Sequence, residues 1–320
     1  MLAAMRVSLA ALLVLAWAAP LPAALPNPPH EDIHFLAEHL PEVAQDAGYF
    51  SLPWPGEWPP AGRWQPFVGI GWSSAKADFL KESGGLASLG ATRGWGERAA
   101  LTLFGFYDRF DVSGSSGEQV LRAPFASAPL DLPERALFSS PRGTFTHFGA
   151  GAAWAHRLSP DDAAHPLAIE AGLVVDRLEL DGYQMDYRLL GGADAGTEGV
   201  LDHSSTATFF TPFVGFEKRF GLGSSFLLIP RVAAGAPLPP ADFDGRLTGP
   251  GFDVSSTDPG GHPGKIGDGF LSLGAGLLHR RSGLEIDIGA VLGFPLFEKI
   301  THPGVDQSFL IHAVWRHRPS

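Results

Sequence analysis

The sequence predicts an all-β protein: a single antiparallel β-barrel that crosses a lipid bilayer with about ten strands. After Pro60, apolar residues alternate repeatedly with small or polar residues, as in strands whose two faces differ. The connections between these segments are alternately short and long, which is typical of membrane barrels. Hydrophobic residues make up 45% of the chain and charged residues 18%, with 40 glycines. Beyond the first 24 residues, no apolar run reaches the roughly 18 residues of a membrane helix.

The first 24 residues have the features of a cleaved export signal. Arg6 precedes an apolar run at 7–19, and small residues and prolines follow. The run is too short to remain as a membrane helix, so we expect residues 1–24 to be a signal peptide cut between Ala18 and Ala24. The chain contains no cysteine, which excludes disulfides and a cysteine-linked lipid anchor.

Residues 25–62 are expected to form a periplasmic arm ahead of the barrel. Apolar residues at helical spacing predict a short amphipathic helix within 30–45. This helix is either loosely docked or inserted into the periplasmic mouth of the barrel. The Pro/Trp stretch 53–60 is typical of a membrane interface, where tryptophan is favoured.

The barrel itself is predicted to occupy residues 63–320. Ten strands are expected, and eight or twelve remain alternatives because the second is short. The predicted strands are 63–79, 86–94, 97–112, 144–158, 166–183, 207–220, 224–238, 269–281, 284–297 and 306–317. The long connections 113–143, 188–204 and 239–267 are expected to be extracellular loops, and the short turns periplasmic. Pro212, Pro230 and Pro295 fit poorly, because proline removes a donor from a strand ladder.

The clearest strand pair is 269–297, with a predicted two-residue loop at Ser282-Gly283. In that register Leu277 faces Ile288 on one side and Gly276 faces Gly289 on the other. One side is apolar along nearly its whole length, and the other is small or charged. This is the opposite of a soluble sandwich and predicts an apolar exterior in contact with lipid.

A second hairpin is predicted at 207–238, with a loop at 221–223. Its register places Phe216 opposite Leu228 on the outside and Phe213 opposite Arg231 on the inside.

These features resemble Gram-negative outer-membrane β-barrel proteins as a class, over residues 63–320. The resemblance implies an outer-membrane location, contact with membrane lipid and lipopolysaccharide, and insertion by the outer-membrane assembly machinery. Members of the class usually end on an aromatic residue, whereas here five residues follow Trp315.

Inward-facing ionisable residues are the main candidates for a functional site in the lumen. The candidates are Glu170, Asp176, Arg231, Arg280, Glu285, Asp287, His312 and Arg316. They form either an ion-paired plug that makes the barrel rigid or a narrow polar path for a small solute. Inward glycines leave room for a path: Gly69, Gly71, Gly149, Gly151, Gly172, Gly274, Gly276, Gly289 and Gly293.

Other chemistry has less support in the sequence. His30, Glu31 and His34 match the zinc-binding pattern H-E-x-x-H, but no domain is predicted to bury them, so we expect no metal or other cofactor. The net charge of −11 argues against a nucleic-acid partner. The predicted function is therefore a narrow small-solute channel or a structural membrane barrel. A hydrolase of lipid or peptide at the rim, around Asp202 and His203, and a barrel that binds partners through its surface loops remain alternatives.

Overall fold

The computed structural model describes residues 58–77, 80–114, 117–121, 134–159, 165–190, 195–236, 238, 242–249, 252–258, 269–294 and 307–317. Regular structure in these ranges is entirely β. Within them, no helix has the length and apolar character needed to cross a bilayer. The predicted signal peptide and nearly all of the arm, with its candidate helix and His30, Glu31 and His34, lie outside the described residues.

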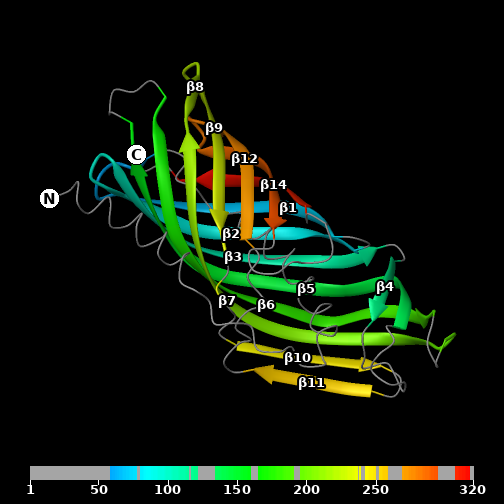
Figure 1. Ribbon diagram of the computed structural model, residues 1–320. Coiled ribbons are helices and arrows are strands. Elements are labelled where there is room, and N and C mark those ends of the chain that lie inside the picture. The colour runs from blue at the N-terminus through cyan, green and yellow to red at the C-terminus, as the bar shows by residue number, and fades with distance from the viewer. Residues whose placement is uncertain are drawn as a thin grey trace.

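The strands join into one antiparallel sheet that closes on itself (Figure 1). The barrel strands are β1 (Trp64–Ala77), β2 (Leu80–Trp95), β3 (Ala99–Gly114), β5 (Glu134–Arg157), β6 (Leu167–Leu189), β7 (Glu198–Lys218), β9 (Phe226–Gly235), β12 (Gly269–His279), β13 (Leu284–Phe294) and β14 (Gln307–Arg316). Pairing of β1 with β14, and of β7 with β9, completes the ring. The predicted ten-stranded barrel is therefore confirmed.

The register shows how far the strands are inclined. A row of paired residues that starts at Glu217 on β7 and is followed once around the barrel returns to β7 at Ser205, twelve residues away (217 − 205). With ordinary strand spacings this offset corresponds to a tilt of about 40°, within the range of closed barrels.

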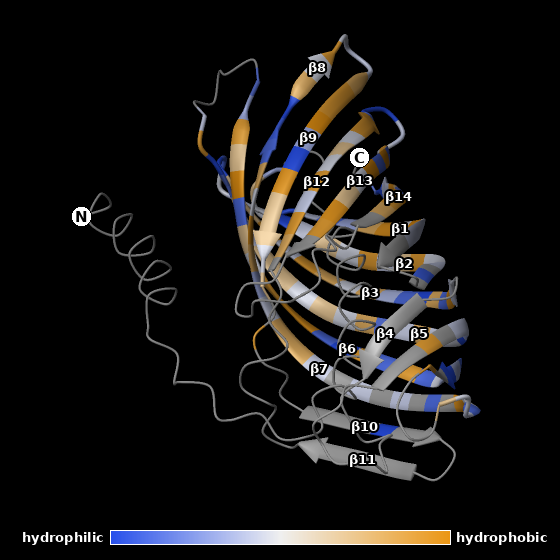
Figure 2. Cartoon of the chain, turned by 45° about the vertical axis from the view of Figure 1, so that its right-hand side comes forward, coloured by the Kyte–Doolittle hydropathy of each residue, from blue (hydrophilic) through white to orange (hydrophobic). Residues whose placement is uncertain are grey.

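Hydrophobic and hydrophilic residues alternate along the strands (Figure 2), and exposed side chains alternate with buried ones. On β1, Ile70 is 71% exposed, whereas Phe67 and Ser73 are buried. Aromatic residues mark the two edges of the outer band. We call the end with the short turns the turn end, or lower end, and the opposite end the upper end. The lower aromatic belt consists of Trp64, Trp95, Trp154 and Trp315, and the upper belt of Trp72, Tyr107, Phe148 and Phe309. Trp64 and Trp72 are eight residues apart on one tilted strand, about 20 Å along the axis, close to the height of a membrane-embedded band.

The barrel wall is much taller on one side than on the other. β5, β6 and β7 have 24, 23 and 21 residues, whereas β12, β13 and β14 have 11, 11 and 10. Two short strands, β10 (Asp242–Gly249) and β11 (Phe252–Asp258), form a hairpin that continues the wall beside β7, and β4 (Gly117–Leu121) pairs with β5 (Figure 1). The long connections predicted as loops therefore contain strand.

Paired irregularities explain why the sequence pattern missed these extensions. Register shifts interrupt β5 between Ser139 and Thr144, and β6 between Leu180 and Tyr183. Gly182 has a positive φ of 60° at the β6 irregularity. Leu180 and Tyr183 are both buried, so the inner face moves from even to odd positions and the two-residue alternation breaks there.

Both predicted hairpin registers need correction. In β12–β13 the turn has four residues, 280–283, and His279 pairs with Leu284. In β7–β9 the loop lies at 223–225, after the three-residue strand β8 (Phe220–Leu222), so Arg231 faces Glu217 rather than Phe213. Both shifts are by an even number of residues, so each side chain stays on its predicted face. Pro212 is tolerated beside the point where the pairing of β7 with β9 ends, and Pro295 lies outside the described residues.

Candidate functional site: a closed lumen

The inner face of β6 shows how the lumen is layered. From the turn end, its inward positions run through Glu170, Val174, Asp176 and Leu178, all buried. Each belongs to a different environment: a charged network, an aromatic layer, a buried acid–histidine trio and an apolar upper region. These environments follow one another along the barrel axis.

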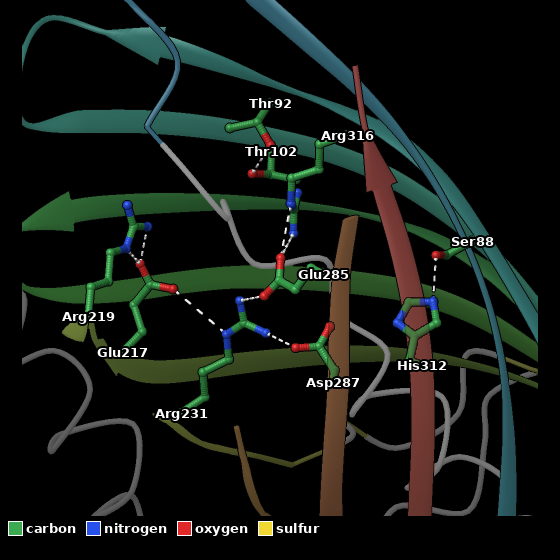
Figure 3. A network of polar contacts seen from close by, with 10 residues as sticks. All are labelled: Ser88, Thr92, Thr102, Glu217, Arg219, Arg231, Glu285, Asp287, His312 and Arg316. Carbon is green, nitrogen blue, oxygen red and sulfur yellow. Dashed lines mark hydrogen bonds and ion pairs between the residues drawn. The ribbon is translucent and has the colours of Figure 1, made fainter. Parts of the chain in front are cut away.

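Arg231 is the centre of the charged network (Figure 3). Its guanidinium forms ion pairs with Glu285 and Asp287 of β13, and its Nε lies 3.8 Å from Glu217 Oε2 of β7. Arg219, just after β7, donates from Nε to Glu217 Oε1 at 2.8 Å. Arg316 of β14 donates from Nε and Nη2 to Glu285 Oε2 at 3.1 and 3.0 Å. The bonds cross the lumen between strands that are not all neighbours.

The backbone of β12 makes room for this network. A Cβ on Gly276 would lie 2.4 Å from Asp287 Oδ1 and 2.5 Å from Glu285 Oε1. Only glycine at this position allows both carboxylates to reach Arg231.

The charges of the network are balanced and almost completely shielded from solvent. Three arginines meet three carboxylates, and all six are buried. Glu170 is buried at the same level, with no hydrogen-bond partner for its Oε2. Removing one partner from such a network leaves an uncompensated charge, which costs about 3–5 kcal/mol. The network therefore fixes the relative positions of β7, β9, β13 and β14.

Neutral polar contacts continue the network around the wall. His312 Nε2 lies 3.2 Å from Ser88 Oγ, and the hydroxyls of Thr92 and Thr102 are 3.1 Å apart (Figure 3). Gly69 makes room for the first pair, because a Cβ there would lie 2.3 Å from His312 Nε2.

A layer rich in phenylalanine lies next to the network in the lumen. One cluster of buried residues draws members from every barrel strand except β2 and β9: Phe67, Phe104, Phe106, Ala153, Val174, Phe213, Phe270, Val291 and Val314. Arg316 stacks over Phe67 at 5.5 Å, which joins the two layers.

Inward glycines accept these rings and do not widen the lumen. A Cβ on Gly151 would lie 2.4 Å from the tip of the Phe104 ring, and one on Gly172 would lie 2.5 Å from the tip of Phe213. The space that the sequence assigned to a solute path is filled at these positions by aromatic rings from adjacent strands.

A separate buried trio lies above the aromatic layer. His147 Nε2 is 2.9 Å from Asp176 Oδ2, and His147 Nδ1 is 3.4 Å from Asp108 Oδ2. The side chains of all three residues are fully shielded from solvent. The Phe106 ring packs against the imidazole at 4.9 Å. The trio links β3, β5 and β6.

Trp58 lies at the turn-end mouth of the lumen. Its ring is 5.4 Å from the Arg157 guanidinium and 5.3 Å from that of Arg219. The segment behind it is tied to the end of β2, because Gly62 N donates to Gly94 O at 2.9 Å. Trp58 thus contacts the charged network through Arg219, and the other tryptophan of the predicted interface stretch, Trp54, lies outside the described residues.

The structure distributes the eight ionisable residues expected from sequence over several environments. Arg231, Glu285, Asp287 and Arg316 are joined directly, whereas His312 bonds to Ser88 and Asp176 belongs to the trio. Arg280 lies in the β12–β13 turn, where its backbone N donates to Ser225 O at 2.8 Å.

Sequence reasoning missed Glu217, Arg219, Asp108 and His147. Alternation placed Glu217, Asp108 and His147 on inner faces of predicted strands and was a usable signal. Arg219 had the same signal, since it lies in the predicted strand 207–220 at an even spacing from the inward Phe213.

The described carboxylates among the rim residues considered for hydrolysis pair with neighbouring polar side chains. Asp202 accepts a hydrogen bond from Gln184 Nε2 at 2.9 Å, and Asp186 pairs with Arg142 at 3.1 Å. His203 follows Asp202 in β7. Within the described residues, no group of three or more His, Cys, Asp or Glu side chains is arranged to hold a metal ion.

No protein-family model and no curated protein sequence matches this chain. Among solved structures, the chain is similar to the outer membrane protease OmpT from Escherichia coli, with a TM-score of 0.44 and 7% identity over 79% of this chain and 96% of that one. It is also similar to an outer membrane channel from Pseudomonas putida F1 (TM-score 0.36, 12% identity, 83% and 99% covered). A third is the translocator domain of the autotransporter NalP from Neisseria meningitidis (TM-score 0.33, 10% identity, 90% and 96% covered). No subfamily is identified by these matches.

Proposed function

We propose that this chain is an outer-membrane β-barrel that is closed to solutes and acts as a structural membrane barrel, not as an open channel. The observation that carries the proposal is the aromatic cluster, whose buried side chains come from eight of the ten strands of the ring and fill the space above inward glycines of adjacent strands. The charged network adds a second closure toward the turn end. A narrow solute path has no comparable support among the described residues.

The membrane location is supported by the exterior. Ile70, Leu89 and Ile288 are each more than half exposed on the outer face of their strands. Residues this apolar, placed between two aromatic belts, match a surface solvated by lipid.

A role in surface interaction is the second candidate, and the uneven wall favours it. β5, β6 and β7 run on past the upper aromatic belt, with the β10–β11 hairpin beside β7. Exposed polar side chains such as Arg142, Asp181 and Arg188 line part of this projecting sheet. Such a rigid polar wall offers a platform for a partner outside the membrane.

Conductance in planar bilayers tests the closed-lumen proposal. We expect the refolded full-length protein to show no stepwise current. Replacing Phe67, Phe104 and Phe213 together by alanine should produce a measurable leak, because it removes three rings from the layer that crosses the lumen. Phe148→Ala, which removes an outward-facing ring, is the control and should stay silent. Stepwise conductance by the unmodified chain would overturn the proposal.

A further inference from the structure

Arg93 lies on the outer surface of the barrel at the turn end, beside two tryptophans. It pairs across the ladder with Trp64, and its guanidinium carbon is 5.7 Å from the Trp64 ring centre and 5.4 Å from that of Trp95. Arg93 makes no ion pair with any described residue, and its Nε is buried without a hydrogen-bond partner. Two aromatic faces therefore hold a cation whose charge is not neutralised by any acidic side chain in the described part of the chain.

The surroundings of Arg93 belong to the lower aromatic belt. Trp64 and Trp95 are 43% and 56% exposed on the outer face. Trp95 also meets Trp154 edge to face, with ring centres 6.0 Å apart. Tryptophan favours the boundary between hydrocarbon and headgroups, and a long arginine side chain there lays its stem on apolar surface and directs its charge to the headgroups.

We propose that Arg93, clamped between Trp64 and Trp95, binds the phosphate of a phospholipid in the leaflet at the turn end. The inference rests on the proposed function, because it requires the barrel to lie in a bilayer. A guanidinium presents a planar fork that matches two phosphate oxygens, and stacking on tryptophan restricts its orientation before the lipid arrives. Glu97, the acidic residue of the adjoining β2–β3 turn, is exposed to solvent and forms no ion pair with Arg93, so the guanidinium stays available to a phosphate.

Lipid titration of the full-length protein in detergent tests the site. Phosphatidylglycerol is added to the refolded chain, and bound lipid is counted by native mass spectrometry. Arg93→Gln should weaken the tightest binding step about fivefold, the contribution typical of one basic residue near anionic headgroups. Arg93→Lys should give an intermediate affinity, since it keeps the charge but loses the fork. Arg281→Gln removes an exposed arginine from the β12–β13 turn at the same end and should change the affinity less than twofold.

Competition and folding controls separate the possible outcomes. Each variant must show the same mobility shift between boiled and unboiled samples as the unmodified chain. Equal lipid affinity of Arg93→Gln and the unmodified protein would overturn the site. Displacement of the lipid by millimolar inorganic phosphate would also overturn it, in favour of a site for free anions. Failure of the proposed membrane location looks different: the unmodified protein would then stay soluble without detergent and bind no lipid at all.

Discussion

Glycine and phenylalanine act as complementary pairs on adjacent strands of the lumen wall. Phe104 covers Gly151, Phe213 covers Gly172, and Phe106 covers Gly149. In each pair the missing side chain on one strand creates the space that the ring on the next strand fills. A tightly packed barrel interior of this kind tolerates neither extra volume nor a lost ring well.

Gly151→Ala should therefore destabilise the barrel. The added methyl collides with the Phe104 ring, and overpacking of this kind costs about 1–3 kcal/mol. Gly105→Ala on β3 is the matched control, because its Cβ would meet nothing closer than the Gly149 carbonyl oxygen at 3.5 Å. The free energy of unfolding in urea, measured in detergent micelles, distinguishes the two. Equal effects would mean that the Phe104 ring does not occupy the space above Gly151.

At the scale of elements, the segment that precedes β1 acts as a strap across the turn-end mouth. Its hydrogen bonds to the end of β2 fix its path, and Trp58 extends from it to Arg157, the last residue of β5, and to Arg219, just after β7. Cation–π contacts are worth about 0.5–2 kcal/mol each, depending on how well they are shielded from water. The strap thus links the end of β5 to the charged network through Arg219.

Trp58→Ala should lower the thermal stability of the folded barrel by a few degrees, since both contacts are lost. Trp58→Phe keeps an aromatic ring that makes weaker cation–π contacts, so its thermal stability should lie between those of Trp58→Ala and the unmodified protein. The measurement is the temperature at which the fast-migrating folded band disappears from a detergent gel. Trp72→Ala, a tryptophan on the outer face of β1, controls for the loss of an aromatic residue in general. If the strap stabilises the mouth, Trp58→Ala should lower this temperature more than Trp72→Ala does.

Elements also show which parts of the structure were predictable from sequence. Alternation identified the ten barrel strands and, outside the bulges, the correct face of their residues. The errors in the two hairpin registers were by an even number of residues, so they left the faces unchanged. The exact register depended on turn lengths that alternation does not encode. The pairing of Arg231 with Glu217, and therefore the partners within the charged network, could not be predicted in detail. The bulges in β5 and β6 reverse the alternation, so the upper wall was assigned to loops.

Across the described barrel, large apolar side chains lie outside and the buried ionisable side chains lie inside, a pattern that matches a protein solvated by lipid. The described interior holds charged side chains that pair with one another and a cluster of buried apolar side chains drawn from eight of the ten barrel strands. Under the proposed function, rigidity and closure come from these same side chains. The long strands β5, β6 and β7 make one end of the barrel wall differ from the other.

Charged substitutions at two depths on one strand test whether the outer face of the barrel lies in lipid. Val68 and Ser74 lie on the same face of β1, Val68 midway between Trp64 and Trp72 and Ser74 just beyond Trp72 of the upper belt. Val68→Arg should destabilise the protein in lipid vesicles by about 2–4 kcal/mol, and Ser74→Arg by about 0–1 kcal/mol, because the cost of a lipid-facing charge falls toward the interface. Unfolding in urea from vesicles provides both values. If the two substitutions cost the same, the outer face of β1 is not in hydrocarbon, and the barrel must bury that face against protein instead.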